Sequence, residues 1–197
     1  MNLLAHLYLS GESEGIRIGN FIGDFVKGRK FNDYPLPIAN GIMLHRKIDH
    51  FTDTNQLTLN SKRLFSSAYR HYSGIIIDMV YDHFLARNWS EYSSYDLDAY
   101  LDQFYQSAYK HWDYLPEEMK SILPKIIANQ RIQSYQTLQG IQDALFSMSQ
   151  YTSLPNHTSF ALDVIHTNYM HLEEQFREFF EEVKKQCDIW LMLDFSN

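Results

Sequence analysis

Two aspartates and a histidine interrupt an apolar stretch of the sequence, GIIIDMVYDHFLARNW at residues 74–89. Asp78 and Asp82 are four residues apart, so on a helix they would lie about 40° apart, and His83 follows directly. The stretch is otherwise apolar on nearly every side, which predicts a buried helix. Burying an ionised carboxylate is costly unless it is paired or binds a metal ion. Either a divalent cation holds both aspartates, or each caps a neighbouring helix or pairs with an arginine.

A second segment, PIANGIMLHRKIDHFTD at residues 37–53, repeats this pattern. His45 and Asp49 are again four residues apart, and they border the apolar side of the expected helix. A single histidine in such a place is usually a core residue with a satisfied hydrogen bond. A His-x3-Asp pair beside an Asp-x3-Asp pair on another buried helix instead favours a shared polar site.

Two more polar residues stand in apolar surroundings. Asp24 lies within RIGNFIGDFVKGR, residues 17–29, and His6 lies within LLAHLYL. Each has a structural alternative, a cap or ion pair for Asp24 and a core hydrogen bond for His6. The glycines of the first segment disfavour helix by up to about 1 kcal/mol each relative to alanine. They suggest that another backbone approaches closely at Gly19, Gly23 and Gly28.

These residues together predict metal-assisted hydrolysis. A set rich in carboxylates and poor in imidazoles suits Mn²⁺ or Mg²⁺ better than structural zinc, which usually binds thiolates. The sequence has no phosphate-binding loop, no nucleophile elbow and no dinucleotide fingerprint. A metal-bound water loses its proton near neutral pH, and the ion also neutralises charge on phosphate oxygens.

The elements that must position these residues are all predicted to be helices, because apolar residues recur at spacings of three and four. The fold class is therefore all-α, and the 197 residues suit one compact domain with the metal site within residues 1–90. Packing helices are expected to fill residues 91–197. The expected helices cover about residues 2–9, 16–28, 37–53, 56–71, 74–89, 95–110, 117–127, 131–150 and 158–186.

Composition narrows the setting. A single cysteine, Cys187, excludes an internal disulfide framework and fits a reducing compartment. The first residues lack a basic region and no apolar run is long enough for a membrane span, so we expect a cytoplasmic protein without membrane insertion. The net charge of −7 argues against general nucleic-acid binding. The charge is uneven, +2 over residues 1–90 and −9 over residues 91–197, so the first part could meet an anionic partner.

Four blocks of the sequence resemble the acyl carrier protein phosphodiesterase family, also called holo-acyl carrier protein hydrolase. They are MNLLAHLYLS, GNFIGDFVKG, GIMLHRKIDHFTD and DMVYDHFLARNW, in the expected order, and the resemblance continues more loosely to the last helix. That family resembles the HD-type metal-dependent phosphohydrolases. The resemblance implies an HD-like helical fold, a Mn²⁺ requirement and hydrolysis of the phosphodiester between 4′-phosphopantetheine and a serine of the carrier protein. Here the adjacent pair reads Asp82-His83 rather than His-Asp, which leaves individual ligand assignments open.

The family blocks fall on nine polar residues of this chain. We expect His83 and His6 to donate protons or to support ligands, and Arg46 to hold a non-bridging phosphate oxygen, with a surface or ion-pair role as its alternative. Asp53 belongs to the same blocks without an assigned role. The expected metal ligands are Asp24, His45, Asp49, Asp78 and Asp82, not all on the same ion.

An acidic, helical carrier protein as substrate calls for a basic rim near the site. Such charges are also common on ordinary solvated surfaces. Two other functions are compatible with the sequence: a metal hydrolase for a small phosphorylated metabolite or nucleotide, and a non-enzymatic helical interaction module. The docking candidates are Lys27, Arg29, Lys30, Lys62, Arg63 and Arg70.

Overall fold

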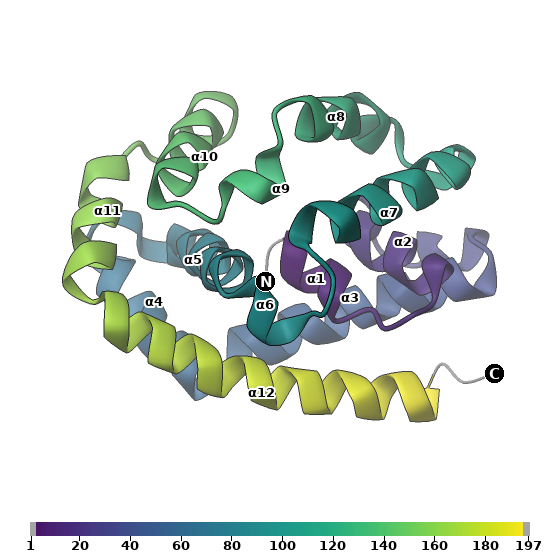
Figure 1. Ribbon diagram of the computed structural model, residues 1–197, viewed down its shortest axis with the longest axis horizontal. Coiled ribbons are helices and arrows are strands. Elements are labelled where there is room, and N and C mark those ends of the chain that lie inside the picture. The colour runs from purple at the N-terminus through teal and green to yellow at the C-terminus, as the bar shows by residue number, and fades with distance from the viewer. Residues whose placement is uncertain (1–2, 195–197) are drawn as a thin grey trace.

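The computed structural model describes residues 3–194, and this part of the chain is helical, with no strand (Figure 1). The all-α prediction is confirmed. The α-helices are α1 (Leu3–Tyr8), α2 (Glu14–Ile22), α3 (Leu36–Thr54), α4 (Gln56–Tyr69), α5 (Ser73–Arg87), α6 (Trp89–Tyr92), α7 (Leu97–Lys110), α8 (Glu117–Ala128), α9 (Arg131–Ser134), α10 (Leu138–Tyr151), α11 (Thr158–Thr167) and α12 (Tyr169–Asp194). Short 3₁₀ helices are η1 (Gly23–Phe25), η2 (Lys30–Asp33), η3 (Arg70–Tyr72) and η4 (Trp112–Tyr114).

Two of the long helices expected from the sequence are broken. The segment 131–150 divides into α9 and α10, because Thr137 adopts extended backbone and its hydroxyl accepts a hydrogen bond from the amide of Gly140 at 3.1 Å. The segment 158–186 divides at Asn168, whose side-chain amide donates to the carbonyl of Val164 at 2.8 Å. Asn and Thr side chains that bond to nearby backbone thus end helices that the apolar periodicity alone would continue.

Helix α5 lies at the centre of the fold, in contact with α1, α4, α10 and α12. Its side chains are buried on nearly all sides, as the sequence predicted, including Ile76, Val80 and Phe84. Helix α12 runs along the lower edge of the view in Figure 1, and α8 and α10 lie along the upper edge, with α9 below and between them. The buried apolar residues of all these helices form one continuous core. This core holds α1 and α5 at fixed distances from α3.

Helices α2 and α3 touch through their backbones. A Cβ built on Gly19 would lie 2.0 Å from the carbonyl oxygen of Ile38, and one built on Gly41 would lie 2.1 Å from that of Ile16. Only glycine fits these two positions, so the expectation of close approach is confirmed at Gly19. It is wrong at Gly28, where a Cβ would meet nothing within 4 Å. The backbone there has φ +59, which explains the glycine instead.

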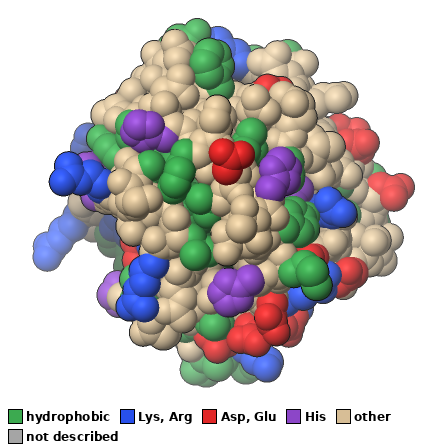
Figure 2. Space-filling model, turned by 90° about the vertical axis from the view of Figure 1, so that its left-hand side faces the viewer, with side chains coloured by type: hydrophobic (Ala, Val, Ile, Leu, Met, Phe, Trp, Pro, Cys, Tyr) green, Lys and Arg blue, Asp and Glu red, His purple; other side chains and the backbone are tan. Residues whose placement is uncertain are grey.

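Charged side chains are distributed unevenly over the surface. In Figure 2, which faces the end of the molecule that carries α11, basic side chains gather along the left margin and acidic ones along the right and lower margins. No helix within residues 3–194 is long and apolar enough to cross a lipid bilayer.

Candidate metal centre

Helices α1 and α3 bring two histidines and an aspartate together. Nε2 of His6 lies 3.2 Å from Oδ1 of Asp49, and Nε2 of His45 lies 3.0 Å from Oδ2 of the same carboxylate. One ligand atom from each of the three residues falls within 4.8 Å of the other two. The His-x3-Asp pair of α3 therefore meets His6 from α1, as expected if they share a site.

Asp24 reaches the same cluster from η1. Its Oδ1 lies 3.4 Å from Nε2 of His45, and its side chain is 77% exposed. The side chain of Asp49 is 38% exposed, whereas those of His6 and His45 are only 4% and 6% exposed. The imidazoles thus form the buried floor of the site, and the two carboxylates form its solvent-facing side.

Asn20 fixes both imidazoles. Its side-chain nitrogen donates to the carbonyl oxygen of His6 and to Oγ of Ser10, both at 2.9 Å, so its Oδ1 is free to accept from Nδ1 of His6 at 2.7 Å. Its backbone carbonyl accepts from Nδ1 of His45 at 2.8 Å. With both Nδ1 atoms protonated, each neutral ring directs the lone pair of Nε2 towards the carboxylates. We did not single out Asn20 in the sequence, although it is a fully buried polar residue in the block that contains Asp24.

Gly23 leaves the space that the ring of His45 occupies. A Cβ at this position would lie 2.2 Å from Cγ of His45, closer than real Cβ contacts. The backbone approach predicted at Gly23 is therefore wrong, because the close neighbour is the side chain of His45 and not a backbone. A site residue on α3 thus depends on a glycine at the end of α2.

The electrostatics of the cluster are those of a cation site. Burial alone would lower the pKa of His45, but the carboxylates of Asp24 and Asp49 outweigh it and raise the pKa to about 9. Burial would raise the pKa of Asp49, yet the neighbouring imidazoles of His45 and His6 hold that pKa well below its ordinary value. Burial, and then the neighbouring His45, lower the pKa of His6. Two carboxylates therefore stabilise positive charge at the point that both Nε2 atoms face.

The donor set fits a divalent ion. Nε2 of His45 is buried, and neither nearby carboxylate lies in hydrogen-bonding geometry to it. Two imidazole nitrogens with carboxylate oxygens from Asp24 and Asp49 form a mixed nitrogen and oxygen set of the kind that divalent metal ions bind. Each imidazole also has the outer hydrogen bond that metal-ligating histidines usually make.

The two aspartates of α5 lie in different surroundings. Asp82 is fully buried, and its oxygens accept hydrogen bonds from the backbone amides of Leu4 at 2.8 Å and Ala5 at 3.1 Å. It thus caps the first turn of α1, which was the structural alternative for these residues. Burial raises the pKa of Asp82 to about 7, and these two amides lower it only in part. Asp78 is half-buried one turn earlier. Neither aspartate belongs to the cluster of His6, His45 and Asp49, and their assignment as ligands stays a prediction.

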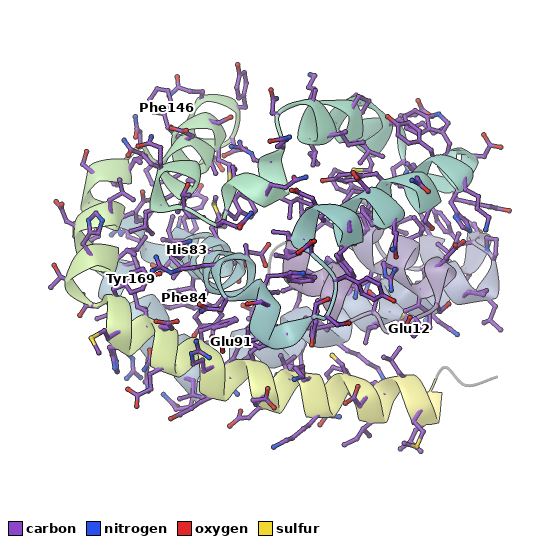
Figure 3. The ribbon with its side chains drawn as sticks, in the orientation of Figure 1. Glu12, His83, Phe84, Glu91, Phe146 and Tyr169 are labelled. Atoms are coloured by element: carbon purple, nitrogen blue, oxygen red, sulfur yellow. The ribbon has the colours of Figure 1, made fainter. Side chains whose placement is uncertain are left out.

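His83 is a fully buried histidine with a partner on each ring nitrogen. Nδ1 lies 2.7 Å from the carbonyl oxygen of Tyr135, and Nε2 lies 2.9 Å from the hydroxyl of Tyr169. His83 and Tyr169 lie together where α5 meets the start of α12 (Figure 3). Burial lowers the pKa of His83, which favours the neutral ring. These contacts match a structural histidine, and its role as a proton donor stays a prediction.

The arginine expected to hold phosphate, Arg46, is half-buried beside the cluster. Nη2 donates to the carbonyl of Val26 at 2.7 Å, and the guanidinium lies over the ring of Phe31, 5.2 Å from its centre. No carboxylate within residues 3–193 forms an ion pair with it, so part of its donor fork is not used by these residues. Asp53, one turn beyond Asp49, pairs with Lys62 at 2.7 Å.

The six basic docking candidates divide into two groups. Lys27, Arg29 and Lys30 are exposed and directly follow the segment that contains Asp24. Lys62, Arg63 and Arg70 line one pocket of about 380 Å³. Asp53, which follows Asp49 by four residues on α3, lines the same pocket. Their role in docking stays a prediction.

Comparison with known proteins adds an independent result. The sequence pattern of the acyl carrier protein phosphodiesterase family matches residues 1–183. A relative from Yersinia pestis with that name is 31% identical over 188 residues, which cover 95% of this chain and 97% of the relative. One from Yersinia enterocolitica is 30% identical over 191 residues, covering 95% and 97%, and one from Photorhabdus laumondii is 29% identical over 189 residues, covering 95% and 96%. No solved structure matches the chain.

Proposed function

Because this chain belongs to the acyl carrier protein phosphodiesterase family, we propose that it hydrolyses the phosphodiester between 4′-phosphopantetheine and a serine of holo-acyl carrier protein. The products are the apo carrier protein and free phosphopantetheine. We further propose that the reaction depends on a divalent cation, first of all Mn²⁺, held by His6, His45 and Asp49 with Asp24 at the solvent side.

The observation that supports the cation is the direction of the two imidazoles. Asn20 accepts from both Nδ1 atoms, so both Nε2 atoms, each of which carries a lone pair when its ring is neutral, face the oxygens of Asp49. Without a positive charge between them, lone pairs and carboxylate oxygens would repel each other. When bound there, the cation supplies an activated water and neutralises charge on the phosphate oxygens.

The residues of the chain supply positioning. Asn20 holds both rings in one tautomer and orientation, and the buried floor of the site excludes water from one side. Arg46 follows His45 directly and keeps part of its fork for a non-bridging phosphate oxygen. The exposed side chain of Asp24 lies where the substrate enters, and the exposed Lys27, Arg29 and Lys30 follow it along the chain.

The experiment is incubation of the purified, Mn²⁺-loaded protein with holo-acyl carrier proteins from several sources, followed by intact-mass spectrometry of the carrier. We expect the carrier to lose the mass of phosphopantetheine less one water, because hydrolysis adds a water across the broken bond. Asp49→Asn should abolish it, because the amide keeps the size but removes the charge that holds the cation. Asp188→Asn, an exposed acid on α12, serves as the matched control. If no carrier protein loses its prosthetic group, the proposed reaction is wrong, and a panel of small phosphorylated compounds then tests the metabolite alternative.

A further inference from the structure

A pocket of about 380 Å³ lies between α4, η3 and the first turn of α5. Four basic side chains line it, and the only carboxylate among its lining residues is that of Asp53. We call it the basic pocket; its basic side chains are Lys62, Arg63, Arg70 and His71. In a chain with a net charge of −7, such a concentration of positive charge needs an explanation.

Most of this charge has no internal counterion. Lys62 is the exception, because its Nζ lies 2.7 Å from Oδ1 of Asp53. Arg63 donates to the neutral side-chain amide of Asn60 at 3.2 Å, and Arg70 is exposed at the start of η3. Neither arginine has an ion-pair partner among the side chains described, those of residues 3–193. Two guanidinium groups are therefore free to bind an anionic group from outside.

The basic pocket begins one helical turn from the candidate metal centre. Asp53 follows Asp49 by four residues on α3, which corresponds to a rise of about 6 Å and a rotation of about 40°. Both carboxylates reach solvent, with 38% of the Asp49 side chain and 70% of the Asp53 side chain exposed. Lys62 then connects Asp53 to the pocket. A substrate bound at His45 and Asp49 would thus extend over the basic pocket if it is larger than a phosphate group.

We propose that the basic pocket holds carboxylate side chains of the protein substrate while its phosphodiester lies at the candidate metal centre. The inference rests on the proposed function and adds to it a second contact point that recognises the protein and not the reacting group. Guanidinium forks match carboxylates in geometry, and several exposed arginines suit an acidic protein segment better than one small anion. Charges of this kind, at the edge of an interface, act on encounter and selectivity and leave the chemical step unchanged.

The test is the double variant Arg63→Glu/Arg70→Glu. We expect KM for holo-acyl carrier protein to rise by roughly tenfold or more and kcat to stay the same, with a weaker dependence of kcat/KM on salt. Lys125→Glu/Arg131→Glu is the matched control, because these residues line a different pocket, between α8, α9 and α10, and the two substitutions change the net charge equally. Hydrolysis of the small diester bis(p-nitrophenyl) phosphate should be equal in all three proteins. Arg63→Gln/Arg70→Gln replaces the first variant if the glutamates impair folding.

Binding without catalysis separates this inference from the proposed function. Calorimetric titration of the metal-free protein with apo-acyl carrier protein should show weaker binding for the Arg63/Arg70 variant than for the control. Equal binding by both variants would overturn the inference even if the wild-type enzyme is active. So would loss of affinity for orthophosphate with carrier-protein binding intact, since this identifies a small-anion site. If the wild-type protein releases no phosphopantetheine, the proposed function fails, and the titration still decides the role of the pocket.

Discussion

The imidazole rings of His6 and His45 lie stacked, with 4.1 Å between their centres and 18° between their planes. Two rings this close cannot both be positively charged without strong repulsion, because like charges at this distance disfavour each other. The pKa of His45 is raised to about 9, and burial lowers that of His6, so at neutral pH the stacked pair carries one positive charge, on His45. In the metal-free protein, the positive charge beside the carboxylates of Asp24 and Asp49 is therefore that of protonated His45.

Metal binding should therefore release about one proton at neutral pH. Below pH 9 the ion must displace the proton of His45, so the apparent affinity for Mn²⁺ should increase with pH, roughly tenfold per unit, and level off near pH 9. Calorimetric titration with Mn²⁺ in two buffers of different ionisation enthalpy measures the proton count. An affinity that does not change between about pH 6 and pH 8 would contradict this assignment.

Gly23→Ala should weaken the metal centre with little effect on the rest of the fold. The new methyl group would meet the ring of His45, which must then move away from Asp24 and Asp49. We expect a loss of Mn²⁺ affinity of roughly ten- to a hundredfold, the range seen when the support of a ligand is lost. Equilibrium dialysis followed by elemental analysis measures this loss.

Gly28→Ala is the control for that substitution. Its Cβ would meet no atom within 4 Å, but the backbone has φ +59. It should reduce the free energy of unfolding by about 1 kcal/mol and leave metal affinity unchanged. Equal metal losses in the two variants would show that His45 does not depend on the space at Gly23.

Asp82 should make the protein less stable as the pH rises from about 4 to about 7. Its pKa is about 7 in the folded protein against an ordinary value of 3.8, so in this range the folded state binds more protons than the unfolded state. The loss is up to about 4 kcal/mol. Asp82→Asn should lack this part of the pH dependence, as measured by urea unfolding at several pH values in the presence of a chelator. If the free energy of unfolding changed equally with pH in the two proteins, a group other than Asp82 would be responsible for the change.

His83→Gln tests the proton-donor assignment directly. If His83 only connects α5 to Tyr135 and Tyr169, the substitution lowers the free energy of unfolding by about 1–3 kcal/mol, and kcat of the folded enzyme remains within a fewfold. Tyr169→Phe removes one of the two contacts and is expected to cost less. A fall in kcat of a hundredfold or more, with unchanged stability, would instead establish the catalytic role expected from the family blocks.

The core of the candidate site could be predicted from the sequence, because helical spacing determines which side chains share a face. His45 and Asp49 were expected on one face of α3, and the structure places them together with His6 and Asp24. The same argument could not distinguish between two kinds of partner for the carboxylate of Asp82. A buried carboxylate can meet a metal ion or the free amides of another helix, and only the packing of α1 against α5 reveals the second.

The remaining differences have similar physical causes. Asn20 supports both imidazoles through contacts between different helices, which no spacing within one helix predicts. The helix breaks before Leu138 and at Asn168 depend on single side chains that bond to nearby backbone, while the apolar period continues through them. The spacing of apolar residues therefore predicted that these segments are helical, whereas local hydrogen bonds determine where some of the helices end.

The contact between the backbones of α2 and α3 limits how this chain can change in length. Gly41 and His45 are four residues apart on α3, and Gly19 on α2 lies four residues before Gly23, the first residue of η1, so each segment runs about one turn from the crossing point to the site. A one-residue insertion or deletion within either turn would rotate the residues beyond it by about 100°. Homologous chains should therefore vary in length in the connecting loops and keep both four-residue intervals.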